Sequence, residues 1–179
     1  MKEISNKELQ ERAAKIKWLF CDIDGTLTDG CVYYSQEGEL LKKFSLRDGT
    51  GFFLLRQAGI KTGFITTECS PIVEQRAKKL KIDKCIFGTH HKLEAVQEFV
   101  KQEGISLDNI AFIGDELNDV KLLEACGFGI AVGDADLRVK EAAKFVCDKL
   151  GGAGAFREAA EKLLEFKGVS ISDIIQKAL

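Results

Sequence analysis

Four acidic residues in this sequence follow apolar runs at the positions where parallel sheets place their chemistry. Asp22 and Asp24 come directly after one run, and Asp115 and Asp119 come after another. Asp22 and Asp24 can both face one site only if the chain bends after Asp22, and Gly25 permits such a bend. Like charges this close repel one another, which favours a bound cation. Oxygen ligands suit a hard divalent ion, so the pattern indicates a magnesium site.

A hydroxyl and an ammonium group follow two further apolar runs. Thr66 comes directly after the run 63–65, and Lys92 comes a short loop after the run 84–87. In an open parallel sheet the carboxyl ends of the strands share one rim, so these groups are expected beside the acidic residues. A carboxylate can attack phosphorus and give an acyl phosphate that water cleaves later. Thr66 and Lys92 are suited to hold the non-bridging phosphate oxygens, so the whole set indicates phosphoryl transfer.

Short apolar runs alternate with longer amphipathic segments along the chain. Strands that alternate with helices predict an α/β fold in which a parallel sheet carries helices on both faces. Strands are predicted at 18–21, 63–65, 84–87, 110–113 and 129–132, with a weaker one at 145–147. Helices are predicted at 51–57, 71–80, 92–101, 119–125, 137–143, 155–166 and 172–178.

One segment breaks this alternation. Residues 31–44 follow the first strand directly and read as a β-hairpin with its turn at Glu37-Gly38. Its apolar side chains cannot all be buried within one subunit, which favours an assembly surface. No linker, repeat or low-complexity segment divides the chain, so residues 1–179 are predicted to form one domain with a C-terminal tail at about 151–179.

The composition excludes several classes of function. The chain has 179 residues, of which 45% are hydrophobic and 30% charged, and a formal net charge of -2. That balance gives no bulk attraction to nucleic acid or to anionic lipid. No apolar run approaches the ~20 residues that span a bilayer, and residues 1–17 lack the apolar centre of a signal peptide. We therefore expect a cytoplasmic protein whose six scattered cysteines are free thiols.

The segment 22–26, Asp-Ile-Asp-Gly-Thr, resembles the first motif of the haloacid dehalogenase (HAD) superfamily of phosphatases. Thr66, Lys92 and the segment 114–119, Gly-Asp-Glu-Leu-Asn-Asp, are similar to the remaining three motifs and occur in the same order. The resemblance implies a Rossmann-like, HAD-type sheet. It also implies hydrolysis of a phosphate monoester through an aspartyl-phosphate intermediate, with magnesium (Mg2+) as the cofactor.

The resemblance assigns a role to each matched residue. It implies that Asp22 is the nucleophile and that Asp24 is the general acid and base. Asp22, the backbone carbonyl of Asp24 and Asp115 would hold the metal, and Asp119 would support that metal shell. Thr66 and Lys92 would bind the phosphoryl group.

A closer resemblance concerns the absence of a cap domain. Larger members of the superfamily insert one after the first or second motif, whereas this chain has only the hairpin there. The missing cap domain, together with Arg47-Asp48-Gly49 and the tail 151–158, resembles the capless ulosonate phosphatases. Those enzymes act on 3-deoxy-D-manno-octulosonate (KDO) 8-phosphate or on nonulosonate 9-phosphates. The resemblance implies a homotetramer in which a neighbouring subunit helps to close each site. It also implies substrate contacts by Arg47 and Arg157.

The second motif departs from the pattern of the octulosonate enzymes. They usually read Thr-Gly-Arg there, whereas this chain has Thr66-Thr67-Glu68. Glu68, with Arg76 eight and Lys79 eleven residues later, resembles the nonulosonate branch instead. Arg76 or Lys79 would then hold the sugar-acid carboxylate, and Glu68 would accept hydrogen bonds from sugar hydroxyls. The sequence thus slightly favours a nine-carbon substrate, KDN or N-acylneuraminate 9-phosphate, over KDO 8-phosphate, and another small sugar phosphate is the alternative.

Other interpretations compete with these. A single aspartate at a strand end is usually a helix cap, and Arg76 and Lys79 share a helix face that solvent alone could occupy. A receiver-type phosphoacceptor domain uses similar groups, but its acceptor aspartate follows a middle strand, where this chain has Thr66. A binding protein with an inactive phosphatase fold would be indicated by the loss of Asp22 or Asp24, and both are present.

Overall fold

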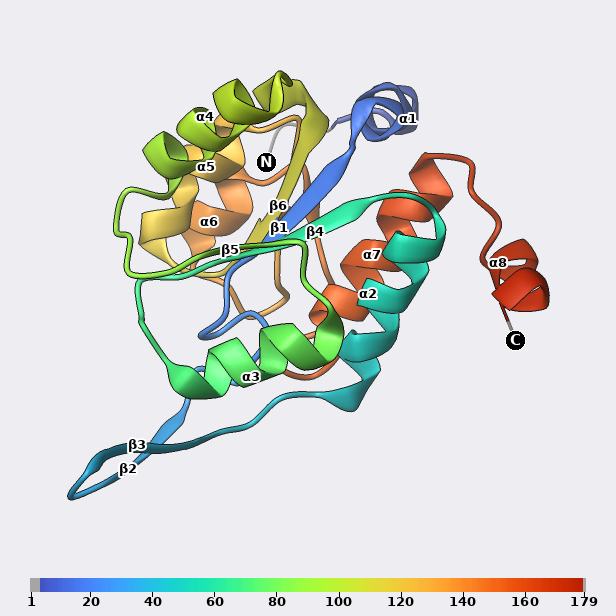
Figure 1. Cartoon of the computed structure of the whole chain (residues 1–179). Helices are drawn as coiled ribbons and strands as arrows, with labels where there is room; N and C mark the ends of the chain where they lie inside the picture. Colours follow the sequence, from blue (N-terminus) through green and yellow to red (C-terminus); the bar gives the residue numbers. More distant parts are fainter. Residues whose placement is uncertain (1–3, 179) are drawn as a thin grey trace.

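The computed structural model describes residues 4–178, and its centre is one parallel sheet of six strands (Figure 1). The strands are β1 Trp18–Cys21, β4 Lys61–Ile65, β5 Lys84–Ile86, β6 Ile110–Gly114, β7 Phe128–Ala131 and β8 Phe145–Val146. They lie in the order β5-β4-β1-β6-β7-β8, so β1 is central although it comes first in the chain. The predicted α/β class and all six predicted strands are confirmed, with ends that shift by one or two residues.

Helices cover both faces of the sheet. They are α1 Asn6–Lys15, α2 Leu46–Gln57, α3 Pro71–Leu80, α4 Lys92–Glu103, α5 Val120–Ala125, α6 Leu137–Ala142, α7 Ala155–Phe166 and α8 Ile171–Ala178. Figure 1 shows α4, α5 and α6 on one face and α1, α2 and α7 on the other. On that second face α2 packs against α7, where the rings of Phe52 and Phe156 stack with centroids 3.8 Å apart.

Two helices differ from the sequence prediction. Helix α1 was not predicted from the sequence. Only its residues Leu9 and Ala13 are buried, and so narrow an apolar stripe gives a weak helical periodicity of hydrophobic residues. Helix α2 begins at Leu46 rather than at residue 51. Its first turn contains a glycine, which lowers helix propensity. Ser45 nevertheless starts the helix as its N-cap, since its hydroxyl accepts a hydrogen bond from the Arg47 amide at 3.2 Å.

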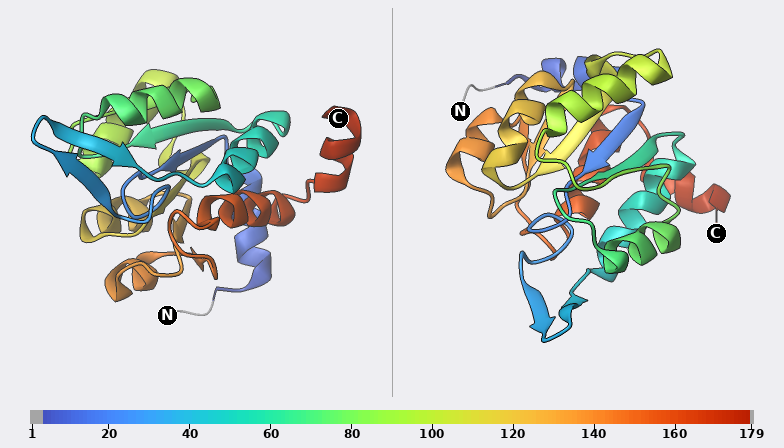
Figure 2. Two further views of the ribbon diagram at one scale, coloured as in Figure 1. Left: turned by 90° about the horizontal axis from the view of Figure 1, so that it is seen from below. Right: turned by 60° about the vertical axis from the view of Figure 1, so that its left-hand side comes forward.

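The predicted hairpin consists of β2 Val32–Ser35 and β3 Gly38–Lys42 and projects beyond the body of the fold (Figures 1 and 2). Ser35 pairs with Gly38, so the turn lies at residues 36–37, one position earlier than predicted. Gly38 carries the positive φ of +122° that this turn requires. A bulge between Tyr33 and Tyr34 shifts the register.

The inner strands of the sheet are buried on both faces, which is why they read as continuous apolar runs in the sequence, and the edge strands β5 and β8 are half-buried. Every residue of β1, β6 and β7 is buried. In the described part of the chain all six cysteines are free, as predicted. Within residues 4–178, no helix combines the length and the apolar character that crossing a bilayer requires.

Candidate active site

The acidic residues meet where two neighbouring strands end. Asp22 follows β1 and Asp115 follows β6, and these strands pair in parallel with Cys21 beside Ile113. The pairing brings the two aspartates to the same rim, and the 3-10 turn Leu117–Asp119 returns Asp119 to it. Ligand oxygens of Asp22, Asp115 and Asp119 all lie within 4.8 Å of one another. The sheet topology therefore assembles the carboxylate cluster that the sequence predicted.

Lys92 joins two of these carboxylates. It is the first residue of α4, and its side chain runs inward until it is fully buried. Its Nζ lies 2.8 Å from Oδ1 of Asp22 and 2.6 Å from Oδ1 of Asp119. Burial disfavours the ammonium charge, but the attraction of the two aspartates outweighs it and raises the pKa of Lys92. The lysine is therefore charged and held in place beside Asp22.

Asp119 and Asp115 are fixed by further hydrogen bonds. Oδ2 of Asp119 accepts from the backbone amides of Asp115 at 2.9 Å and Glu116 at 3.2 Å. The hydroxyl of Thr26 donates to Oδ1 of Asp115 at 2.7 Å. Both oxygens of Asp119 are thus engaged within the protein. This arrangement suits a residue that orients the cluster rather than one that contacts a substrate.

The cluster carries more negative than positive charge. Three carboxylates face one ammonium group, and burial is the main reason why the pKa of Asp22 rises to about 8 and that of Asp115 to about 7. Lys92 lowers both pKa values but does not offset the burial. A buried set of oxygen donors with excess negative charge fits a hard divalent cation.

Thr66 stands at the rim end of β4, next to β1 in the sheet, and its side chain is buried. Its Oγ1 accepts a hydrogen bond from the amide of Glu68 at 3.2 Å. That bond leaves the hydroxyl proton of Thr66 free to donate. A buried hydroxyl donor beside a carboxylate cluster is suited to a phosphate oxygen.

The C-terminal tail closes around the first motif. The amide of Gly152 donates to the carbonyl of Thr26 at 3.0 Å, and a Cβ at position 151 would lie 1.7 Å from the carbonyl oxygen of Gly25. Only glycine permits this approach at position 151. The tail is therefore part of the wall of the site.

One group at the rim was not predicted from the sequence. Lys42, the last residue of β3, contacts the carboxylate of Asp24, and its Nζ lies 3.0 Å from Oε1 of Glu39. Oε2 of Glu39 accepts a hydrogen bond from the hydroxyl of Ser70. Strand alternation separates Lys42 from Lys43, but the sequence alone does not tell which of the two turns toward the rim. The base of the hairpin thus belongs to the site.

The five predicted substrate-binding residues do not form a single cluster. Arg47 and Arg157 line a hollow of about 400 Å³ between α2 and α7. Glu68 and Lys79 are exposed on the loop before α3 and on α3 itself. Arg76 is half-buried, donates a hydrogen bond to the carbonyl of Ser45 at 3.0 Å, and stacks on the ring of Phe44. Within one subunit Arg76 therefore braces the segment between the hairpin and α2.

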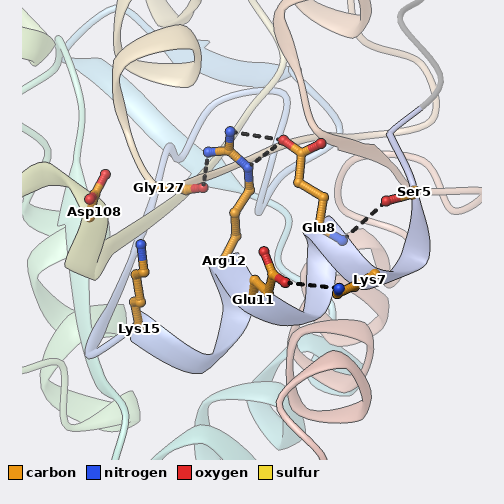
Figure 3. Close-up of a pocket in the computed structure, with 8 residues that line it drawn as sticks. All are labelled: Ser5, Lys7, Glu8, Glu11, Arg12, Lys15, Asp108 and Gly127. Atoms are coloured by element: carbon orange, nitrogen blue, oxygen red, sulfur yellow. Dashed lines mark hydrogen bonds and ion pairs between the residues drawn. The ribbon is translucent and has the colours of Figure 1, made fainter.

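A larger hollow, of about 610 Å³, lies along α1 (Figure 3). Its residues Lys15, Asp108 and Gly127 stand just before strands β1, β6 and β7, so it faces the opposite edge of the sheet from the acidic rim. Arg12 there donates to the carbonyl of Gly127 at 3.3 Å and to Glu8 at 3.0 Å. These contacts attach α1 to the sheet. The carboxylate cluster and Lys92 lie at the opposite ends of the strands, so this hollow is not part of the candidate active site.

Comparison with known proteins decides the family. Residues 73–154 match the family model of haloacid dehalogenase-like hydrolases. The 3-deoxy-D-manno-octulosonate 8-phosphate phosphatase of Haemophilus influenzae is 37% identical over 162 residues, which cover 90% of each chain. The chain belongs to the HAD-like phosphatases.

Solved structures of this family share the whole fold. The octulosonate 8-phosphate phosphatase of Moraxella catarrhalis, solved in complex with magnesium, phosphate and KDO, superposes with a TM-score of 0.91 at 36% identity. That match covers 97% of this chain and 99% of the other. A cobalt-bound form of the H. influenzae enzyme gives a TM-score of 0.84 at 37% identity, covering 88% of this chain and 92% of the other. For a HAD-like phosphatase the receiver-domain alternative no longer applies.

Proposed function

We propose that this chain is a magnesium-dependent phosphatase whose substrate is KDO 8-phosphate. The observation that carries the proposal is the cluster of the buried Asp22 and Asp119 with the half-buried Asp115, whose oxygens lie within 4.8 Å of one another beside the charged Lys92. The substrate is inferred from relatives that are named KDO 8-phosphate phosphatases at 34–37% identity. We further propose that the chain is a single domain in which the hairpin stands in place of a cap.

Asp22, the backbone carbonyl of Asp24 and Asp115 are the proposed ligands of magnesium, with Asp119 supporting them. The excess negative charge and the all-oxygen donor set support this choice. Magnesium bound there supplies positive charge that offsets the repulsion between the substrate phosphate and the carboxylates.

In the proposed first step, the Asp22 carboxylate attacks phosphorus while the bond from phosphorus to the sugar oxygen breaks. Asp24 gives its proton to that leaving oxygen, and the product is an aspartyl phosphate. In the second step Asp24 takes a proton from water, whose oxygen attacks phosphorus and releases Asp22 and inorganic phosphate. Lys92 and the hydroxyl of Thr66 hold the non-bridging oxygens through both steps.

The nine-carbon substrate favoured by the sequence stays a prediction. It depended on Arg76 or Lys79 as a carboxylate ligand with Glu68 beside them, and the contacts of Arg76 with Ser45 and Phe44 give that arginine a bracing role within its own subunit. Arg47 and Arg157 are the remaining candidates for the substrate carboxylate. They line one hollow, in which the Arg157 guanidinium pairs with Glu161, so a substrate carboxylate would have to replace that partner.

We also propose that the protein is a homotetramer. The hairpin leaves Tyr33, Tyr34, Leu40 and Leu41 between 56% and 71% exposed, and exposed apolar side chains grouped on one element are typical of an interaction surface. Light scattering at micromolar concentration is expected to give four times the subunit mass of 19.8 kDa. A monomeric mass would contradict the proposal. The cytoplasmic location stays a prediction.

The proposed function is tested by phosphate release from a panel of sugar-acid phosphates. KDO 8-phosphate is expected to be the best substrate, activity is expected to cease in excess chelator, and magnesium is expected to restore it. Asp22→Asn keeps the size of the side chain but cannot form the acyl phosphate, so its turnover should be abolished while the fold remains intact. Turnover that persists in chelator, or near wild-type turnover by Asp22→Asn, would overturn the mechanism.

A further inference from the structure

The side chain of Lys42 is shielded from solvent although Lys42 stands on the projecting hairpin (Figure 1). Its side chain is only 4% exposed, whereas that of its neighbour Lys43 is 67% exposed. Both lysines contact aspartates that follow the first strand: Lys42 contacts Asp24, and Nζ of Lys43 lies 2.7 Å from Oδ2 of Asp29. A desolvated lysine is ordinarily retained only where it is paired, and Lys42 has two carboxylate partners, Asp24 and Glu39.

A second contact shows that this arrangement extends across the rim. Ser70 is the N-cap residue of α3, but its side chain makes no capping hydrogen bond. The hydroxyl instead donates to Glu39, which in turn contacts Lys42. One chain of contacts therefore runs from the loop after β4, through the base of the hairpin, to Asp24 in the loop after β1.

We propose that Lys42 is a positioning residue, held by Glu39 and Ser70, that fixes the carboxyl group of Asp24 where it can reach the leaving oxygen of the substrate. This inference rests on the proposed function, in which Asp24 exchanges a proton with the ester oxygen. Orientation matters because proton transfer requires heavy atoms within hydrogen-bond reach. Without Lys42, the side chain of Asp24, 34% exposed, is free to rotate into solvent.

The effect of Lys42 should depend on the leaving group. A sugar alkoxide leaves poorly unless it is protonated as the bond to phosphorus breaks, so its release depends on a well-placed Asp24. A nitrophenolate leaves without that proton. Hydrolysis of the aspartyl phosphate needs Asp24 for both esters, but kcat/KM reports only the steps up to release of the leaving group. Loss of a merely structural contact would therefore lower kcat/KM for both esters alike, whereas loss of the position of Asp24 would lower kcat/KM mainly for the sugar ester.

The experiment measures kcat and KM of wild type, Lys42→Met, Lys42→Arg and Lys43→Met on KDO 8-phosphate and on p-nitrophenyl phosphate. For Lys42→Met we expect kcat/KM on the sugar ester to fall at least about tenfold and kcat/KM on the aryl ester to change by less than about threefold, a fraction of the ~10²–10⁴ that acid–base catalysis supplies. Lys42→Arg, which keeps the charge, should recover most of the loss. Lys43→Met is the matched control and should behave as wild type on both esters.

A second variant covers the case in which Lys42→Met does not fold. Glu39→Gln keeps the size of the side chain but weakens the hold on Lys42, and the same preferential loss on the sugar ester is expected to a smaller extent. Equal loss on both esters, or no loss on either, would overturn the role of Lys42 while leaving the phosphatase itself intact. A wild-type protein that hydrolyses neither ester would overturn the proposed function and this inference together.

Discussion

Gly25 lies so close to Asp115 that a Cβ at position 25 would be 2.0 Å from the Oδ2 of that aspartate. Gly25 also has a φ of +86°, in the left-handed region that other residues rarely adopt. The turn after Asp22 therefore needs glycine for two reasons, its backbone conformation and the space that Asp115 occupies. The bend that the sequence predicted at this residue is what allows the first and last motifs to touch.

Gly25→Ala is expected to inactivate the enzyme. The added methyl would displace Asp115, and a misplacement of about 1 Å at a catalytic group can cost ~10²-fold in rate. Gly59→Ala is the matched control, because Gly59 has a φ of +74° but nothing within 4 Å of its Cβ position. Both variants should lose about 1–2 kcal/mol of stability from backbone strain, and only Gly25→Ala should lose activity. Urea unfolding together with steady-state kinetics checks both expectations, and an active Gly25→Ala would show that Asp115 tolerates displacement.

Lys92→Met is expected to destabilise the protein and to inactivate it. Removing the ammonium group leaves Asp22 and Asp119 buried without their cation, and breaking a buried pair in this way typically costs about 3–5 kcal/mol. Lys101→Met, an exposed change on the same helix, should stay within about 0.5 kcal/mol of wild type. The free energy of unfolding, measured in chelator, decides this. A Lys92→Met protein as stable as the Lys101→Met control would mean that the cluster does not depend on its lysine.

The metal-free protein should lose stability as the pH rises. Burial holds the pKa of Asp22 at about 8 and that of Asp115 at about 7, above their unfolded value of about 3.8. Over that range the folded state binds more protons than the unfolded state, so the free energy of unfolding falls with increasing pH, by at most about 1.4 kcal/mol per pH unit for each group. The stabilisation is full below about pH 4 and is lost as the pH passes 7 and 8.

Unfolding in urea between pH 5.5 and 8, with excess chelator, measures this slope. Asp115→Asn removes one of the two groups, so it should reduce the slope. Magnesium competes with protons for the same oxygens, so it should stabilise the protein more at pH 8 than at pH 5.5. A stability in chelator that is flat or rises over this range would contradict the assigned cause.

The sequence predicted the rim better than it predicted the elements around it. Asp22, Thr66 and Asp115 directly follow strands that are buried on both faces, so the apolar runs located them to within a residue. The position of Lys42 was not predictable, because it depends on which face of the hairpin turns toward the rim. A hairpin with few core contacts leaves no hydrophobic pattern that fixes this choice.

Ser70 and Arg76 illustrate the same limit. Ser70-Pro71 predicts a helix start correctly, and the hydroxyl that should cap the helix binds Glu39 instead. Arg76 was predicted as a substrate ligand from its spacing to Glu68, whereas its partner within the subunit is the backbone carbonyl of Ser45, 31 residues earlier in the chain. Local sequence patterns predict helices and strands, whereas tertiary contacts determine the hydrogen-bond partners of long polar side chains.

Arg76→Ala is expected to lower stability more than it lowers substrate affinity. The guanidinium hydrogen bond to Ser45 and the stacking on Phe44 together should be worth about 1–3 kcal/mol, since the group is half-buried. Lys79→Ala on the exposed face of the same helix is the control and should change stability by less than about 0.5 kcal/mol. If Arg76 instead holds the substrate carboxylate, Arg76→Ala would raise KM for sugar-acid esters and leave KM for p-nitrophenyl phosphate unchanged.

The same assays determine the length of the substrate. On wild type, KDO 8-phosphate is expected to be preferred over a nonulosonate 9-phosphate by at least tenfold in kcat/KM, which is about 1.4 kcal/mol of transition-state discrimination. Glu68→Ala separates the two possibilities further, because Glu68 is the residue that the sequence associates with the nine-carbon ester. If the nine-carbon ester is preferred and Glu68→Ala removes that preference, then Glu68 binds the longer sugar and the proposed eight-carbon substrate is wrong. If Glu68→Ala changes neither ester, the residue belongs to the solvated surface of the loop before α3.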